Sequence, residues 1–328
     1  MTRFAPLALL ASALTLPASA EEAVTPNSIV AATPAADWIA IDPADLMVMD
    51  LAPDRDGNER RVVIQLMSAP FGRGWVGNIR KLAAAHWWDG TSVYRVQDNY
   101  VVQWGDVTEK KVLPEGLKAV PESEYALLIT DNMDEAVTGT LTDAFEAYFE
   151  NRHYWKKGEV DDFPRSGPDA DIETWAKGWP LATNEDGASV WPVHCYGMVG
   201  VARDLKTTGT GSDLYVVIGH APRQLDRNIA LVGRVIEGIE HLSSLPRGKS
   251  ELGFYGDDEA DKRVPIRSVR IGAEARDLPR FEYLSTESDS FVAYAHSRAN
   301  RQDDFYKVPA GGVDICNVPV PIRREGAK

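Results

Sequence analysis

Apolar residues in this chain gather in short runs of strand length, and turn signals separate the runs. Residues 45–52 read DLMVMDLA and residues 60–67 read RRVVIQLM, with Asp56-Gly57-Asn58 between them. This pattern predicts a β-hairpin. Strand-like runs return at residues 196–204, 213–222, 229–236 and 264–271. Short strands with turns between them and few helices predict a mostly β domain, either a sandwich or a barrel.

Three other stretches have the spacing of helices. Residues 74–90 repeat apolar side chains at helical intervals and end on Asp89-Gly90. Residues 142–158 combine aromatic and charged side chains in an amphipathic pattern, and residues 288–306 also read as a helix. We therefore expect helices to cover parts of a β structure.

The charge of the chain limits its partners. The 328 residues include 49 acidic and 35 basic ones, which gives a formal charge of −14. Nucleic acids and anionic membrane surfaces are bound through basic patches, so neither is expected as the main partner. The length fits two domains or one domain enlarged by insertions.

The first twenty residues are typical of a secretory signal peptide. Arg3 is a short basic start, residues 4–16 are an apolar run too short to span a bilayer, and Ala18-Ser19-Ala20 is a small-residue cleavage site. An uncleaved anchor is the alternative, although its apolar run is usually longer. We expect residues 1–20 to be removed, with export to a bacterial periplasm and no membrane insertion after cleavage.

Export bears on the two cysteines, Cys195 and Cys316. An even pair in an oxidising compartment is typical of a disulfide. This bond would tie the C-terminal region to the centre of the chain and would be worth about 4–5 kcal/mol in the chain-entropy model. Two buried free thiols are the alternative. A catalytic thiol is disfavoured, because His194 beside Cys195 would point to the opposite face of a strand.

Motifs for several other chemistries are missing. The six histidines lack metal-ligand spacing, so we expect neither a metal nor a cofactor. The glycine-rich stretch 207–213 lacks the lysine of a phosphate-binding loop. The chain has no G-x-S-x-G elbow, and its adjacent acid pairs are more typical of solvated loops than of a glycosidase.

Two longer segments carry a more specific pattern. Residues 88–106 read WDGTSVYRVQDNYVVQWGD, and residues 211–242 read GSDLYVVIGHAPRQLDRNIALVGRVIEGIEHL. The first resembles the YDGTxFHR…F…QGGD hallmark of cyclophilin-type peptidyl-prolyl cis-trans isomerases, and the second resembles that family's GSQFFI…LDG…VFGRVxEGM segment. Either segment alone would be weak evidence, whereas the two in this order are specific.

The resemblance implies a domain organisation. Residues 44–272 would form a cyclophilin-like closed antiparallel β-barrel capped by helices. Residues 107–192 would be an insertion, far longer than the family's usual connection, and residues 273–328 a helical C-terminal extension. Residues 21–43 are rich in Pro, Ala and Thr, and we expect them to be loosely ordered.

The resemblance also implies the chemistry. Rotation about an X-Pro bond faces a barrier of about 18–20 kcal/mol, and an enzyme lowers it by binding the twisted amide better than the planar one. A donor aimed at the amide nitrogen or a neighbouring carbonyl stabilises the twisted state. Arginine suits this role because its planar group stays charged. By resemblance the catalytic donor is Arg95, and a surface charge on an edge strand is the alternative.

Further site residues follow from the resemblance. An apolar pocket for the proline ring would be formed by Tyr100, Val101, Tyr215 and Leu225. Ordinary barrel packing is the alternative for the first three. The substrate backbone would be held by Gln103 and Ala202.

The chain departs from the family at several positions around the pocket, among them Leu214 and Tyr215 in place of two phenylalanines and Gln224 in place of a tryptophan. Tyr94 and Ile229 replace histidines, and Asp213 replaces a glutamine. An acid at position 213 would favour substrates with basic residues near the proline.

The predicted function is therefore isomerisation of X-Pro bonds in exported polypeptides by a monomeric folding helper. A proline-peptide binding module or chaperone with weak or no turnover is the main alternative. A third interpretation is a structural or assembly subunit in which the insertion makes the contact, and it requires residues 142–158 to be exposed to solvent.

Overall fold

The computed structural model describes residues 24–129, 139, 141, 172–184, 188–275, 277–301, 305–308, 310 and 312–326. The predicted signal peptide and the predicted helix at residues 142–158 lie outside this part of the chain. Among the described residues, no helix has the length and apolar character needed to cross a bilayer.

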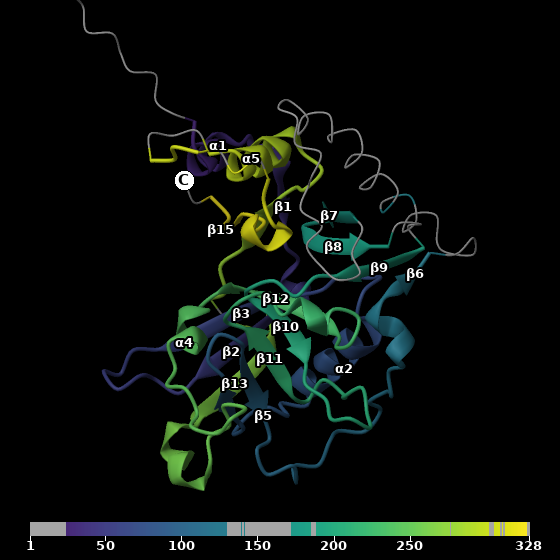
Figure 1. Ribbon diagram of the computed structural model, residues 1–328. Coiled ribbons are helices and arrows are strands. Elements are labelled where there is room, and N and C mark those ends of the chain that lie inside the picture. Colours follow the sequence, from purple (N-terminus) through teal and green to yellow (C-terminus); the bar gives the residue numbers. More distant parts are fainter. Residues whose placement is uncertain are drawn as a thin grey trace, which may run out of the picture.

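Eight antiparallel strands form a closed barrel in the order β10-β11-β5-β4-β13-β2-β3-β12, with β12 pairing back to β10 (Figure 1). The strands are β2 (Leu46–Leu51), β3 (Arg60–Leu66), β4 (Ser92–Val96), β5 (Val101–Gly105), β10 (Met198–Val201), β11 (Leu214–Val217), β12 (Leu231–Glu237) and β13 (Val264–Ile271). This confirms the predicted mostly β fold and the closed antiparallel barrel.

The predicted hairpin at residues 45–67 is the pair β2–β3, in a register that runs from Leu46 opposite Gln65 to Leu51 opposite Arg60. In its turn, the Asp54 carboxylate accepts a hydrogen bond from the backbone N–H of Asn58 at 2.8 Å. Alternate side chains of the two strands fill the barrel interior, namely Met47, Met49, Leu51, Val62, Ile64 and Leu66. Successive side chains along each strand therefore point alternately into the barrel and away from it.

Two helices add to the barrel core. Helix α2 (Arg73–Ala84) corresponds to the predicted helical stretch at 74–90 and buries Trp75, Ile79 and Leu82 in the same cluster as the barrel interior. The short helix α4 (Glu240–Ser243) buries Leu242 there. The described residues also form short 3-10 helices: η1 (Ala35–Asp37), η2 (Pro43–Asp45), η3 (Glu122–Tyr125), η4 (Arg223–Leu225), η5 (Asp257–Lys262) and η6 (Ile315–Asn317).

A second hydrophobic core lies beside the barrel and is built from the insertion and both terminal regions. The insertion contributes a four-stranded sheet of β6 (Leu127–Leu128), β9 (Ser189–Pro192), β8 (Trp179–Thr183) and β7 (Ile172–Ala176), called the insertion sheet below. The terminal regions contribute the sheet of β1 (Trp38–Ala40), β14 (Phe281–Leu284) and β15 (Ile322–Arg324), with helices α1 (Pro26–Ala32) and α5 (Asp289–Ala299). Helices α1 and α5 lie side by side above the barrel in Figure 1.

The N-terminal segment is more ordered than its composition indicates. We expected residues 21–43 to be loosely ordered, but residues 26–40 form α1 and β1. Thr25 caps α1 with a capping box, and β1 pairs with β14, which lies more than 240 residues later in the chain. Trp38 is buried in the second core. Long-range pairing and burial therefore order a segment whose local composition favours disorder. Helix α5 begins where the helix at residues 288–306 was predicted to begin, but it ends at Ala299. Strands β14 and β15 lie in the same C-terminal region.

The disulfide between Cys195 and Cys316 is present, with the two Cα atoms 5.0 Å apart. It joins the segment between β9 and β10 to the C-terminal extension, as the cysteine count predicted.

A buried arginine links the barrel to the insertion sheet. Arg234, on β12, donates to Gln65 Oε1 from Nε at 2.9 Å and to the Gly178 carbonyl from Nη1 at 2.6 Å. Its guanidinium also lies over the Trp179 ring, 4.5 Å from the centroid. Burial lowers the pKa of Arg234 to about 9, so the side chain stays charged at neutral pH. This contact fastens the β7–β8 hairpin to the barrel wall.

Candidate active site on the outer wall of the barrel

A groove of about 830 Å³ crosses the outer wall of the barrel at strands β4, β5 and β11 and passes Ala202, just after β10. Strand alternation creates it: Val102, Trp104 and Val216 point into the core, while Val101, Gln103 and Tyr215 point outward. Every site residue predicted from the sequence lines this groove, namely Tyr94, Arg95, Tyr100, Val101, Gln103, Ala202, Asp213, Tyr215, Leu225 and Ile229. The structure thus brings the predicted set together, and the roles of its members stay predictions.

Arg95 lies on β4 and is held by three acceptors. Its Nε donates to the Leu252 carbonyl at 2.7 Å, its Nη1 donates to Gln103 Oε1 at 3.0 Å, and its Nη2 donates to Gln97 Oε1. All three acceptors are neutral oxygens. Partial burial lowers the pKa of Arg95, but an arginine side chain titrates far above neutral pH, so the group stays charged. The groove therefore contains a positioned cation without a neutralising carboxylate among its hydrogen-bond partners in the described chain.

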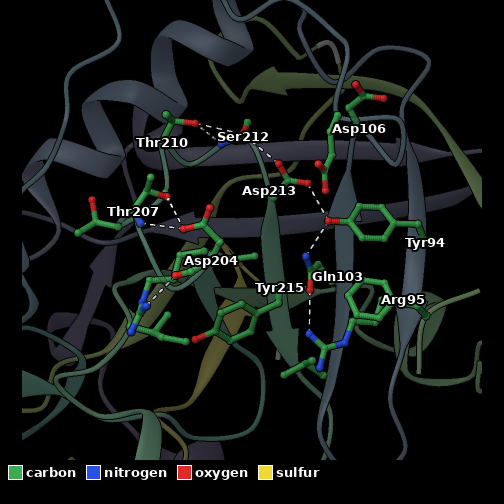
Figure 2. Close-up of a pocket in the computed structure, with 18 of the residues that line it drawn as sticks. Tyr94, Arg95, Gln103, Asp106, Asp204, Thr207, Thr210, Ser212, Asp213 and Tyr215 are labelled. Atoms are coloured by element: carbon green, nitrogen blue, oxygen red, sulfur yellow. Dashed lines mark hydrogen bonds between the residues drawn. The ribbon is translucent and has the colours of Figure 1, made fainter. Parts of the chain in front are cut away.

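A hydrogen-bonded chain runs from Arg95 to a carboxylate (Figure 2). Gln103 accepts from Arg95 through Oε1 and donates through Nε2 to the Tyr94 hydroxyl at 2.6 Å. The Tyr94 hydroxyl donates to Asp213 Oδ1 at 2.7 Å, and the Ser212 hydroxyl donates to Asp213 Oδ2 at 3.0 Å. Burial and the adjacent carboxylate raise the pKa of Tyr94 well above its ordinary value, so its hydroxyl keeps its proton. The direction of each hydrogen bond is therefore fixed.

The Asp213 carboxylate occupies space that is free because residue 105 is a glycine. Gly105 has a φ of 153°, and a Cβ atom built there would lie 2.0 Å from Asp213 Oδ1. Burial raises the pKa of Asp213, and the carboxylates of Asp106 and Glu109 add to this, although its two hydroxyl donors act in the opposite direction. The carboxylate is thus half-buried and near other acids.

An apolar hollow lies next to Arg95. Val101, Tyr215 and Val217 form its buried base, and Tyr100, Ala202, Leu225 and Ile229 pack against them. Gly200 pairs with Tyr215 across β10 and β11, and a Cβ atom there would lie 2.3 Å from the tyrosine ring. The Tyr215 ring thus fills space left by Gly200. Tyr100, Val101, Tyr215 and Leu225 are the residues predicted to receive a proline ring, and that role stays a prediction.

Acidic side chains also line the groove. Asp106 and Asp204 both line it. Burial alone would raise the pKa of Asp106, but backbone N–H groups, that of Lys111 first, outweigh this and lower it. Backbone N–H groups of Lys206 and Thr207 lower the pKa of Asp204. The groove therefore combines the cation of Arg95 with carboxylates at separate places along its wall.

The loop before η5 supplies two groove residues that the sequence patterns did not single out, Leu252 and Phe254. The Phe254 ring stacks on Tyr94, with centroids 6.0 Å apart, and lies 4.9 Å from the Arg95 guanidinium carbon. The only local signal was an aromatic residue in the turn-like stretch ELGFYG. Within the described residues, no cluster of three or more His, Cys, Asp or Glu side chains is arranged to hold a metal ion.

Comparisons with known proteins bear on the family and the fold of the chain. The model of the family described as cyclophilin type peptidyl-prolyl cis-trans isomerase/CLD matches residues 61–271, more than half of the chain. Among solved structures, the chain is similar to cyclophilin AquaCyp293 from Hirschia baltica, with a TM-score of 0.59 and 19% identity over 87% of this chain and 92% of that one. A cyclophilin-type isomerase from Cryptosporidium parvum is matched at a TM-score of 0.35 and 14% identity, over 69% of this chain and 97% of that one, a similarity too low to carry an argument. No curated protein matches the chain significantly.

Proposed function

Because the chain belongs to the cyclophilin-type peptidyl-prolyl cis-trans isomerases, we propose that it isomerises X-Pro bonds of exported polypeptides and so assists their folding. Arg95 is the catalytic donor in this proposal, and the hollow over Tyr215 receives the proline ring. The observation that carries it is the placement of one fixed, charged guanidinium at the edge of an apolar hollow.

The geometry suits a reaction that consists of rotation about one bond. When the X-Pro amide twists, its nitrogen lone pair becomes localised and accepts a hydrogen bond better than in the planar state. A charged donor held in place gains this energy without reorganising during the reaction. The apolar hollow holds the ring on one side of the bond, so that the other side can rotate.

Arg95 retains donors for a substrate. A guanidinium has five N–H groups, and the three hydrogen bonds described above use Nε and one N–H on each terminal nitrogen. In the described part of the chain, these bonds leave one N–H on each terminal nitrogen for the substrate. The acceptors thus orient the group without using all its donors.

Export and a role in folding rest on other features. The first twenty residues have the pattern of a signal peptide, and the Cys195–Cys316 disulfide fits an oxidising compartment. Unfolded exported chains present X-Pro bonds that interconvert in tens to hundreds of seconds when uncatalysed. Localisation of the tagged protein and mass measurement of its mature N-terminus test the export step.

Turnover is tested with a proline-peptide isomerisation assay on the wild type, Arg95→Ala and Arg95→Lys. We expect Arg95→Ala to lower kcat/KM by about two orders of magnitude, the loss typical of removing a transition-state donor. Arg267→Ala removes an exposed arginine that pairs with Glu59 away from the groove, and this matched control should keep full activity. Equal activity of the wild type and Arg95→Ala would contradict the assignment.

The alternative is a binding module with weak or no turnover, and the altered rim favours it, since Tyr94 and Asp213 replace family residues there. In that case the wild type would bind proline peptides without accelerating their isomerisation. The assembly-subunit interpretation depends on residues 142–158, which lie outside the described residues.

A further inference from the structure

A chain of polar side chains leads from the floor of the proline pocket to the insertion sheet. The Tyr215 hydroxyl lies 2.8 Å from His194 Nε2, and His194 Nδ1 lies 2.7 Å from Asp226 Oδ1. Arg223 donates from Nε to Asp226 Oδ2 at 2.7 Å, and its Nη1 lies 2.6 Å from Glu173 Oε1. One continuous network therefore joins the pocket to strand β7.

Burial makes this network sensitive to each of its members. Exposure is 1% for His194, 4% for Tyr215, 6% for Glu173 and 8% for Asp226. A buried polar group that loses its partner cannot form a hydrogen bond with water instead, so the full free energy of its desolvation destabilises the fold. The side chains of the network therefore fix one another's orientation. A substitution at one end is expected to shift the side chains at the other end.

The network reaches the pocket by two routes. The first ends on the Tyr215 hydroxyl, which holds the ring that forms the pocket floor. The second passes through η4, the three-residue helix that carries both Arg223 and Leu225, and Leu225 lines the groove. Glu173 thus contacts the single arginine from which both routes begin.

The position of Glu173 gives the insertion a role at the site. Glu173 belongs to β7, which pairs with β8 in the insertion sheet and not with a barrel strand. His194, Tyr215 and Asp226 come from the barrel and its loops. The Tyr215 hydroxyl points away from Arg95 (Figure 2) and lies against His194, so this contact can hold the orientation of the ring.

We propose that Glu173 is a positioning residue for the proline pocket. Through Arg223, Asp226 and His194 it fixes the Tyr215 ring and Leu225, and the insertion sheet thereby sets how tightly the pocket holds a proline ring. This inference rests on the proposed function in one respect, that the hollow receives proline.

The test compares KM, kcat and the directly measured Kd for a neutral peptide with one Ala-Pro bond. In Glu173→Ala we expect KM and Kd to rise about fivefold, within the range of coupling between contacting residues, with kcat little changed. The pocket holds the ring equally in the planar and twisted states, so its loosening weakens uniform binding. Glu173→Gln keeps an acceptor for Arg223 and should restore near-normal KM.

Arg234→Met is the matched control, because Arg234 also fastens the insertion sheet to the barrel but does not line the groove. It should lower stability and leave KM unchanged. Tyr215→Phe removes a single oxygen at the far end of the network and should also raise KM. This variant provides the test if Glu173→Ala does not fold. The double variant Glu173→Ala/Tyr215→Phe should raise KM by less than the product of the two single effects.

Unchanged KM and Kd in Glu173→Ala or Tyr215→Phe would overturn the inference, as would an equal rise in Arg234→Met or strictly multiplicative effects in the double variant. The proposed function has a separate test. If the wild type binds the peptide but does not accelerate its isomerisation, the isomerase proposal is wrong, and the Kd values still decide whether Glu173 positions the pocket.

Discussion

The Tyr94 hydroxyl donates to Asp213 Oδ1 at 2.7 Å while it accepts from Gln103 Nε2 at 2.6 Å. Gln103 in turn accepts from Arg95. Two neutral side chains therefore separate the guanidinium from the carboxylate, and neither charge neutralises the other by direct contact. A peptide in the groove meets a donor at one point and an anion at another.

This arrangement predicts a substrate preference that depends on Asp213. Asp213→Asn keeps the shape of the side chain and removes its charge, so affinity for peptides with Lys or Arg near the proline should fall about threefold, as for a partly screened ion pair. Affinity for neutral peptides should stay the same. Titration calorimetry with matched Lys and Ala peptides measures this, with Glu59→Gln as a distant control. An unaltered affinity for the basic peptide in Asp213→Asn would rule out the preference.

The same carboxylate predicts a pH dependence of stability. The pKa of Asp213 is raised in the folded state, so in the window between its unfolded and folded pKa values the folded state binds more protons than the unfolded state. Stability from this group therefore falls as pH rises through the window and is regained as pH falls. In urea titrations, the free energy of unfolding of the wild type relative to Asp213→Asn should rise on acidification from neutral pH. A difference that is constant with pH would contradict the raised pKa.

The parts of the fold that follow from local pattern could be predicted. The β2–β3 hairpin, the strand alternation and helix α2 depend on neighbouring residues, so sequence spacing was enough to expect them. The groove residues lie on predicted strands or next to them, and the resemblance to the family indicated which of them would line a site. The disulfide followed from having two cysteines in a chain expected to be exported.

The rest depends on contacts between distant segments, which spacing does not encode. The N-terminal segment is ordered because β1 pairs with β14. Phe254 reaches the site from a loop, where an aromatic residue has no periodic signal. The sequence of β12 gave no indication that the Arg234 side chain would contact Gly178 and Trp179 in the insertion.

The disulfide predicts a loss of stability on reduction. Cys195 and Cys316 are 121 residues apart, and opening a loop of that length returns entropy to the unfolded chain, worth about 2–5 kcal/mol. Cys316→Ser should lower the free energy of unfolding by this amount, and reductant should have the same effect on the wild type but none on the variant. Equal stability of the oxidised and reduced wild type would contradict the expectation.

A last prediction concerns the space that Gly105 leaves for Asp213. Gly105→Ala would place Cβ 2.0 Å from Asp213 Oδ1 at a φ of 153°, so we expect a loss of about 2–3 kcal/mol in stability from steric crowding and backbone strain. The displaced carboxylate should also lose its hydrogen bond from Tyr94 and its preference for basic peptides.

A double-mutant cycle separates crowding from strain. Asp213→Ala removes the colliding oxygen, so Gly105→Ala should cost less in that background than in the wild type, by about 1 kcal/mol or more. Gly57→Ala is the matched control, because Gly57 has a φ of 84° with open space around its Cβ position and reports backbone strain alone. Additive costs in the cycle, measured by urea unfolding, would show that the Asp213 carboxylate does not occupy the space beside Gly105.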